Sequence, residues 1–374
     1  MKRQVTSQHT RNGKSASQPY SLRPLSYGGE GQGEVDQDIR RTSALLILYV
    51  LLALLTALPA QAQLIPSFGS DRAGTSGFQF LKIPVDARSA ALGETVASNA
   101  FDASALFWNP ALAAQARQAQ IGLSHTAYFA DVQMDYVAAF RRFGAFTLGA
   151  SLQTLSSGEM DVTTEFQPFG TGQTFSYVDV AAGLTVAQQL TDLFSYGVTA
   201  KYIRESVAGL STQTAVFDLG IFYRIGGSGV QMAVAIRNFG LDGTPSGELE
   251  RVVIGGVVTE SDFESITPPT TFLLGMTYDV FQANPQHSLQ VSGQLTNPND
   301  NAESLNAGLE YTWNDLLILR TGYRVGVDEY TTPSFGAGLN VPPFLGSIAL
   351  RFDYGFTQLE RLGTVHRVGL NLGL

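Results

Sequence analysis

The chain has 374 residues, of which 44% are hydrophobic and only 15% are charged, and its formal net charge is −9. A soluble domain usually has about 25% charged residues, and a nucleic-acid-binding protein needs a basic patch, so the composition argues against both classes. The absence of cysteine excludes disulfides, thiolate metal sites and cysteine nucleophiles.

The first 62 residues are predicted to be a leader that is removed on export. Residues 1–39 are polar, Arg40-Arg41 follows, and residues 44–58 form an uncharged apolar run. Ala60-Gln61-Ala62 then provides a small-residue cleavage pattern, so we expect a secretory signal peptide cleaved near 62/63. The alternative is a transmembrane helix, but fifteen residues fall short of the roughly 20 that span a bilayer.

Residues 63–118 show no regular alternation and are expected to form a separate small segment. An apolar stretch at 78–83 is followed by small residues at 86–100 and by a turn or helix-entry signal at Asn109-Pro110. A segment of this size is too small to fold alone. Inside a wide barrel it would fill the lumen as a hatch.

Residues 119–374 alternate between apolar and small or polar side chains. In 305–313, one face reads Leu, Ala, Leu, Tyr and Trp, and the other reads Asn, Gly, Glu and Thr. A period of two predicts strands. We count fourteen such stretches, at 120–128, 134–142, 144–155, 176–188, 195–206, 214–225, 229–238, 270–281, 287–297, 304–314, 317–326, 334–341, 345–356 and 364–374.

Two all-β architectures alternate in this way. A soluble β-sandwich would carry many Lys and Glu on its polar faces, whereas here these faces carry mainly Gly, Thr, Ser, Asn and Gln. The apolar faces end in aromatic residues such as Tyr311 and Trp313, as in the girdles of outer-membrane barrels. The predicted fold is therefore all-β: a transmembrane antiparallel barrel of about 14 strands with a small N-terminal hatch, placed in the lipid bilayer of the outer membrane.

The connections support this fold, because tight turns follow the even-numbered stretches and longer connections follow the odd-numbered ones. We expect outward loops at 156–175 and 239–269, with shorter ones at 207–213, 298–303, 327–333 and 357–363. These loops are rich in Asp and Glu. The acidic residues are either a solvated surface or a docking surface for basic segments of a partner.

Charged residues on the polar faces are candidates for the barrel lumen. They are Arg224, Arg237, Arg320, Arg324, Arg351, Asp218, Asp279, Glu310 and Asp353, with Arg204 and Asp179 nearby in the pattern. They either form a ladder of opposite charges that holds the hatch to the wall or line a constriction that binds a substrate. The histidines are isolated and no catalytic motif is present, so we predict no enzyme activity, no metal, no cofactor and no nucleic-acid partner.

The stretch 80–114 resembles the N-terminal signature of the PorV/PorQ family. The matching positions are Phe80, Leu81, Ala87, Arg88, Gly93, Asp102, Ala105, Asn109, Pro110 and Ala111. The resemblance implies a barrel similar to the FadL transporters, in which the hatch contains the Asn-Pro-Ala turn. One departure is the chain end, 367–374, which lacks the terminal aromatic residue common in outer-membrane barrels.

The resemblance also implies a role in type IX secretion. PorV-like members receive secreted proteins through a C-terminal sorting domain and pass them to the attachment machinery, and PorQ-like members hold the attachment complex at the surface. The alternative is FadL-like transport of hydrophobic small molecules such as fatty acids or hydrocarbons. The hatch motif is common to both, so the sequence leaves them open.

Overall fold

The computed structural model describes residues 72–374 except 117, 166, 254, 255, 283, 285 and 345–347. The predicted signal peptide lies outside the described residues.

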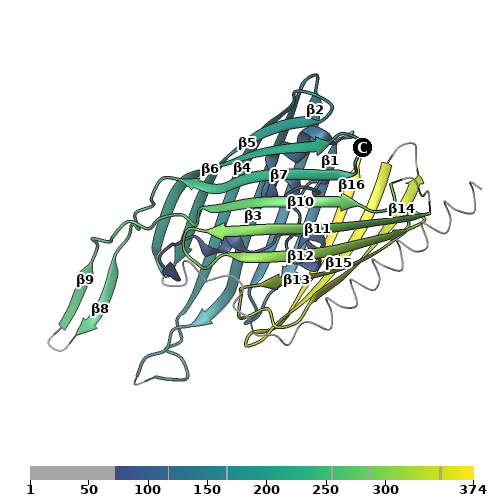
Figure 1. The fold of residues 1–374 in the computed structure, drawn as a ribbon. Coiled ribbons are helices and arrows are strands. Elements are labelled where there is room, and N and C mark those ends of the chain that lie inside the picture. The colour runs from purple at the N-terminus through teal and green to yellow at the C-terminus, as the bar shows by residue number, and fades with distance from the viewer. Residues whose placement is uncertain are drawn as a thin grey trace, which may run out of the picture. The chain divides into compact units, whose positions relative to one another are not determined.

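Fourteen antiparallel strands form a closed barrel, in which β1 pairs with both β2 and β16 (Figure 1). This confirms the predicted fold class and strand number. The barrel strands are β1 (Gln120–Ala127), β2 (Gln133–Phe143), β3 (Phe146–Asp161), β4 (Thr174–Gln189), β5 (Phe194–Val207), β6 (Leu210–Ile225), β7 (Val230–Gly240), β10 (Thr271–Asp279), β11 (His287–Pro298), β12 (Ser304–Trp313), β13 (Leu317–Val325), β14 (Ser334–Phe344), β15 (Ile348–Leu359) and β16 (Gly363–Gly373).

The alternation of side chains separates an outer apolar face from an inner face. On β6, Leu219 and Ile221 are 44% and 46% exposed, whereas Asp218 before them and Phe222 after them are fully buried. An exposed apolar band around a closed barrel is the surface that lipid covers. The outward positions of β6 therefore face the membrane and its inward positions face the hatch.

Two of the predicted loops are wrong. Strands β5 and β6 continue through 207–213 and meet at a two-residue turn, Ala208-Gly209, in which both residues have positive φ. Strands β15 and β16 likewise take up most of 357–363. Polar residues interrupt the apolar alternation at these strand ends, yet the backbone ladder continues, so alternation alone makes these loops too long.

The predicted loop 239–269 contains a hairpin that the alternation did not reveal. Its strands are β8 (Leu249–Val253) and β9 (Gly256–Glu260), which pair with each other as a separate two-stranded sheet. The sequence signal was present: two valine-rich runs flank Gly255-Gly256, which is typical hairpin chemistry.

The described residues before β1, from 72 to 116, are here called the hatch and contain four short helical pieces. They are η2 (Gln79–Lys82), α2 (Ala87–Ala91), α3 (Ala105–Trp108) and η3 (Pro110–Gln115). Helix α2 packs against β13, β14, β15 and β16, and η3 packs against β3, β4, β5 and β6. The hatch provides most of the largest buried apolar side chains, so the core of the molecule lies inside the barrel.

No helix in the described part of the chain is long and apolar enough to cross a membrane.

Candidate functional site

The barrel wall carries glycine where the hatch backbone comes close to it. A Cβ atom at Gly322 would lie 2.0 Å from the carbonyl carbon of Leu92, and one at Gly355 would lie 2.5 Å from the carbonyl oxygen of Ala87. Only glycine permits such an approach of two backbones. The inward wall glycines that meet the hatch are Gly122, Gly149, Gly197, Gly220, Gly275, Gly308, Gly322, Gly336 and Gly355. The sequence pattern places glycine on the polar faces of the strands, but this role was missed from the sequence.

The Asn-Pro-Ala turn joins the hatch to strand β6. The Asn109 side chain accepts a hydrogen bond from the N–H of Ala111 at 3.1 Å and donates to the carbonyl oxygens of Ala97 and Ile221 at 2.9 and 3.3 Å. Asn109 thus caps η3 while Pro110 occupies its first position, a favourable start for a helix. Gly220 leaves the space in which the Asn109 side chain lies.

All ten positions of the predicted hatch motif are buried. Asp102 and Arg88 are 7% and 6% exposed, and the other residues of the motif are buried as well. Several of these residues have a packing role: Phe80 and Leu81 lie in the core. Gly93 adopts a φ of 63° and lies against the backbone of Tyr323. Arg88 and Asp102 instead begin a polar network with the wall.

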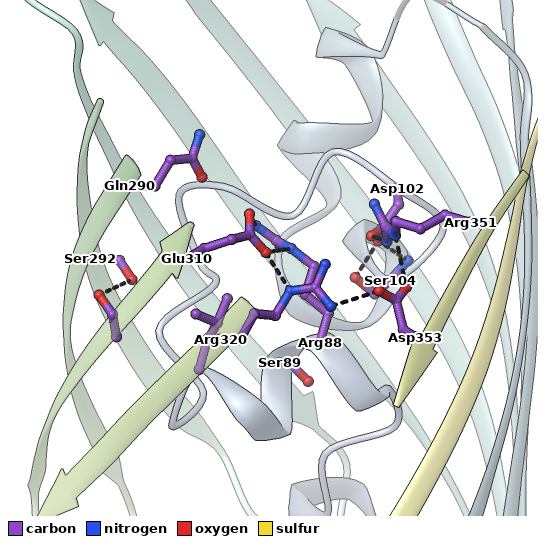
Figure 2. Close-up of polar contacts among 12 residues, drawn as sticks. Arg88, Ser89, Asp102, Ser104, Gln290, Ser292, Glu310, Arg320, Arg351 and Asp353 are labelled. Atoms are coloured by element: carbon purple, nitrogen blue, oxygen red, sulfur yellow. Dashed lines mark hydrogen bonds and ion pairs between the residues drawn. The ribbon is translucent and has the colours of Figure 1, made fainter. Parts of the chain in front are cut away.

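The first half of this network connects α2 with β12 and β13. The Arg88 guanidinium donates to both oxygens of Glu310, Nε to Oε2 at 2.8 Å and Nη2 to Oε1 at 3.0 Å. Arg320 donates to the same carboxylate oxygen, Nε to Oε2 at 2.5 Å. Glu310 therefore accepts hydrogen bonds from two guanidiniums, one from the hatch and one from the wall (Figure 2).

The second half returns from the wall to the hatch. Arg320 Nη1 donates to Asp353 Oδ1 at 2.6 Å, Arg351 Nε donates to Asp353 Oδ2 at 2.7 Å, and Arg351 Nη2 donates to Asp102 (Figure 2). Ser104 donates to Asp102 from both its N–H and its hydroxyl.

Six residues of alternating sign thus form one continuous chain, here called the charge chain: Arg88, Glu310, Arg320, Asp353, Arg351 and Asp102. It begins and ends on the hatch and crosses the wall between. The alternating sign of charge matters because a buried charge without a partner of opposite sign costs several kcal/mol of stability. The three positive and three negative groups compensate one another.

Asp102, the last residue of the charge chain, stays ionised. Burial by itself would raise the pKa of Asp102, but the Arg351 and Arg88 guanidiniums outweigh burial and hold the pKa below its ordinary value of 3.8. A carboxylate with a lowered pKa adds stability above its unfolded pKa and loses it only in more acidic solution. The contact is therefore fully charged at neutral pH.

Other predicted lumen charges hold the hatch separately. Arg324 Nη1 lies 2.5 Å from the Glu94 carboxylate of the hatch. Arg237 lies over the Phe107 ring, with 3.9 Å between its guanidinium carbon and the ring centroid, and donates to the Leu81 carbonyl. Glu94 was missed from the sequence because it stands outside the strand pattern.

The remaining predicted charges contact the wall alone. Asp218 pairs with Lys201 at 2.5 Å, Asp279 accepts from two wall glutamines, and Arg224 lies over the Phe222 ring. Asp179 is buried on the inner face, whereas Arg204 is exposed and faces outward, contrary to expectation. Arg204 follows the buried Ile203, so the alternation itself places it outside.

The hatch runs lengthwise through the barrel. At the loop end, the Gly77 N–H donates to the Thr267 carbonyl at 3.1 Å, and Lys82 pairs with Asp300 at 2.9 Å. At the opposite end, the Ser195 hydroxyl donates to the Ala111 carbonyl at 2.8 Å, close to the point where the hatch joins β1. The lumen is therefore occupied by hatch residues along its length.

Comparison with known proteins agrees with this architecture. Residues 67–227, the hatch and strands β1 to β6, match the family described as type IX secretion system protein PorV. No curated protein sequence gives a significant match.

Among solved structures, three β-barrel proteins are similar. The Ralstonia pickettii toluene transporter TbuX matches with a TM-score of 0.51 and 14% identity, over 80% of this chain and 98% of that one. The Pseudomonas putida toluene transporter TodX matches with a TM-score of 0.52 and 14% identity, over 77% and 96%. A Pseudomonas aeruginosa FadL homologue matches with a TM-score of 0.51 and 12% identity, over 77% and 97%.

At these identities the structural likeness concerns the fold. Together with the sequence match to the hatch and the first six strands, it places the protein among outer-membrane barrels: residues 67–227 match the PorV family, and the chain has a FadL-like β-barrel fold.

Proposed function

We propose that the protein is a surface docking component of type IX secretion, which binds secreted proteins at the outer mouth of a barrel that stays closed. It binds and hands over its cargo without chemistry. Its partners are secreted proteins with a C-terminal sorting domain, or proteins of the attachment complex.

The observation that carries this proposal is the fixed hatch. The charge chain ties the hatch to the wall at two points, Arg88 and Asp102, and the wall glycines let the hatch backbone contact the strands directly. Opening a pore would expose these buried charges and break all the contacts together. The surfaces left for a partner are therefore the loops at the outer mouth.

The connection between β7 and β10 is the best candidate for partner binding. It is the longest of the outer connections and carries the β8–β9 hairpin. Its acidic residues outnumber its single basic residue, Arg251, and would attract a basic partner segment. They are Asp242, Glu248, Glu250, Glu260, Asp262 and Glu264.

A second function has support from the fold alone. TbuX and TodX are toluene transporters, and passage of hydrophobic molecules past a movable hatch would use the same architecture. One cavity between hatch and wall, at Asp86, Tyr136 and Asp353, measures about 20 Å³. That volume holds a water molecule but not toluene.

The test is a mild-detergent pull-down of the tagged protein from its native outer membrane, with bound proteins and small molecules identified by mass spectrometry. We expect secreted proteins that share a C-terminal β-domain. A matched variant in which residues 249–260 are replaced by Gly-Gly-Ser should lose them, because it lacks the hairpin while the barrel ladder from β7 to β10 remains.

Recovery of fatty acids or hydrocarbons without any protein partner would contradict the docking proposal and favour transport. Equal recovery of secreted proteins by the hairpin variant would move the binding surface to another loop.

A further inference from the structure

The outer face of the barrel has a hollow where strands β1, β2 and β3 approach the end at which the hatch joins β1. The register places Ile121, Ala139, Ala150 and Leu184 in one row across four strands. The two alanines stand where the neighbouring row has Val137 and a leucine, so they leave a depression between large side chains.

This depression is part of a groove of about 820 Å³, within the range of small-molecule sites in proteins. Its apolar lining includes Ile121, Leu148, Leu374 and the two alanines. The wall beneath is continuous, because Ala139 pairs with Ala150 and the next pair, Phe140 and Gly149, follows without a gap. The groove is therefore an external feature and gives no passage into the lumen.

Arginine stands at the edge of the groove nearest the strand ends. Arg141 and Arg142 both line it, and they form the one adjacent pair of basic residues after the leader. Arg141 faces outward and lies over the Phe143 ring, with 5.7 Å between its guanidinium carbon and the ring centroid. Arg142 is held by the Gly144 carbonyl and by Gln189.

The end of the barrel that carries the short turns and the chain terminus is the periplasmic end in outer-membrane barrels. An outward arginine at this level meets the phosphates of the inner leaflet, while apolar side chains above it meet the acyl chains. A cationic rim next to an apolar groove matches the two parts of one phospholipid.

We propose that this groove, here called the β1–β3 groove, is a binding site for one phospholipid of the inner leaflet. The phosphate lies on Arg141, and an acyl chain lies over Ala139 and Ala150. The site is independent of the proposed docking function, because it lies at the opposite end of the barrel from the outer loops.

The test uses the full mature protein, stripped of lipid in detergent and titrated with palmitoyl-oleoyl-phosphatidylglycerol under native mass spectrometry. We expect one saturable binding step. Arg141→Gln should weaken it about tenfold, the loss of about 1.4 kcal/mol, and Ala139→Leu with Ala150→Leu should weaken it at least as much by filling the groove.

Two matched controls should bind as the wild type does: Arg361→Gln, an exposed arginine in the turn between β15 and β16, and Ala182→Leu, an outward alanine on β4. Melting temperatures show that each variant is folded, and Ala150→Leu alone replaces the double variant if that one does not fold.

Non-saturable lipid uptake, or unchanged affinity in both groove variants, would overturn the proposal. Equal binding of dioleoylglycerol, which has no phosphate, would overturn the role of Arg141. These outcomes do not depend on whether the protein binds secreted proteins.

Discussion

Glu310 is the residue on which the contact between hatch and wall depends most. It accepts from Arg88 of the hatch and Arg320 of the wall, and it is nearly buried. Because a buried guanidinium needs an anionic partner, removing this negative charge takes from Arg88 the carboxylate to which it donates and leaves Arg320 with Asp353 alone.

We therefore expect Glu310→Gln to loosen the hatch by about 3–5 kcal/mol. Hydrogen exchange at residues 86–92 measures this directly, and exchange should become faster there while the strands stay protected. Asp279→Asn is the control, because Asp279 accepts hydrogen bonds from Gln231 and Gln290 of the wall and none from the hatch. Equal exchange in both variants would mean that packing, and not the charge chain, holds the hatch.

At the scale of elements, the hatch and the strands fit because backbone meets backbone. Helix α2 and the residues after it lie against Gly322, Gly336 and Gly355. A side chain at these positions would separate hatch and wall and lengthen the hydrogen bonds of the charge chain. Short helical pieces with small residues, such as Ala87–Ala91, are the counterpart of this glycine surface.

Gly322→Ala tests this fit. The added Cβ would lie 2.0 and 2.2 Å from backbone atoms of Leu92 and Gly93, so something must shift, and we expect a loss of about 1–3 kcal/mol or more. Thermal unfolding in detergent is the measurement. Gly293→Ala should unfold like the wild type, because the nearest atom to its Cβ is 3.9 Å away. A wild-type melting temperature for Gly322→Ala would contradict the close packing of hatch and wall.

At the scale of the whole molecule, a barrel of this width needs a filled lumen to remain closed. The hatch extends from the outer loops, at Gly77 and Lys82, to the opposite end, at Ala111. Sealing is thus a property of the complete chain: the strands form the wall, and residues before β1 close it.

In planar bilayers we expect the wild type to show no steady conductance, and Glu310→Gln to show brief openings. A variant without residues 72–116 should conduct continuously if it inserts, which a heat-modifiability gel establishes. Steady conductance of the wild type would contradict a closed lumen and favour the transport function.

The sequence by itself determined the barrel. A period of two over fourteen stretches, with apolar outer faces and small polar inner faces, admits few other folds, because lipid demands a continuous apolar surface and a closed ladder of hydrogen bonds. The same alternation predicts which charged side chains point into the lumen. It does so correctly where the pattern is regular, as at Arg320 and Asp353, whereas it misplaces Arg204 by one residue.

Only the tertiary structure decided which of these charges meet. Arg88 and Glu310 are 222 residues apart, and closure of the barrel around the hatch brings them into contact. The role of the wall glycines was likewise decided by the tertiary structure, because the strand pattern does not show which part of the hatch lies against each glycine. Local periodicity fixes the direction of a side chain, but the partner across the lumen depends on strand register, closure and the path of the hatch.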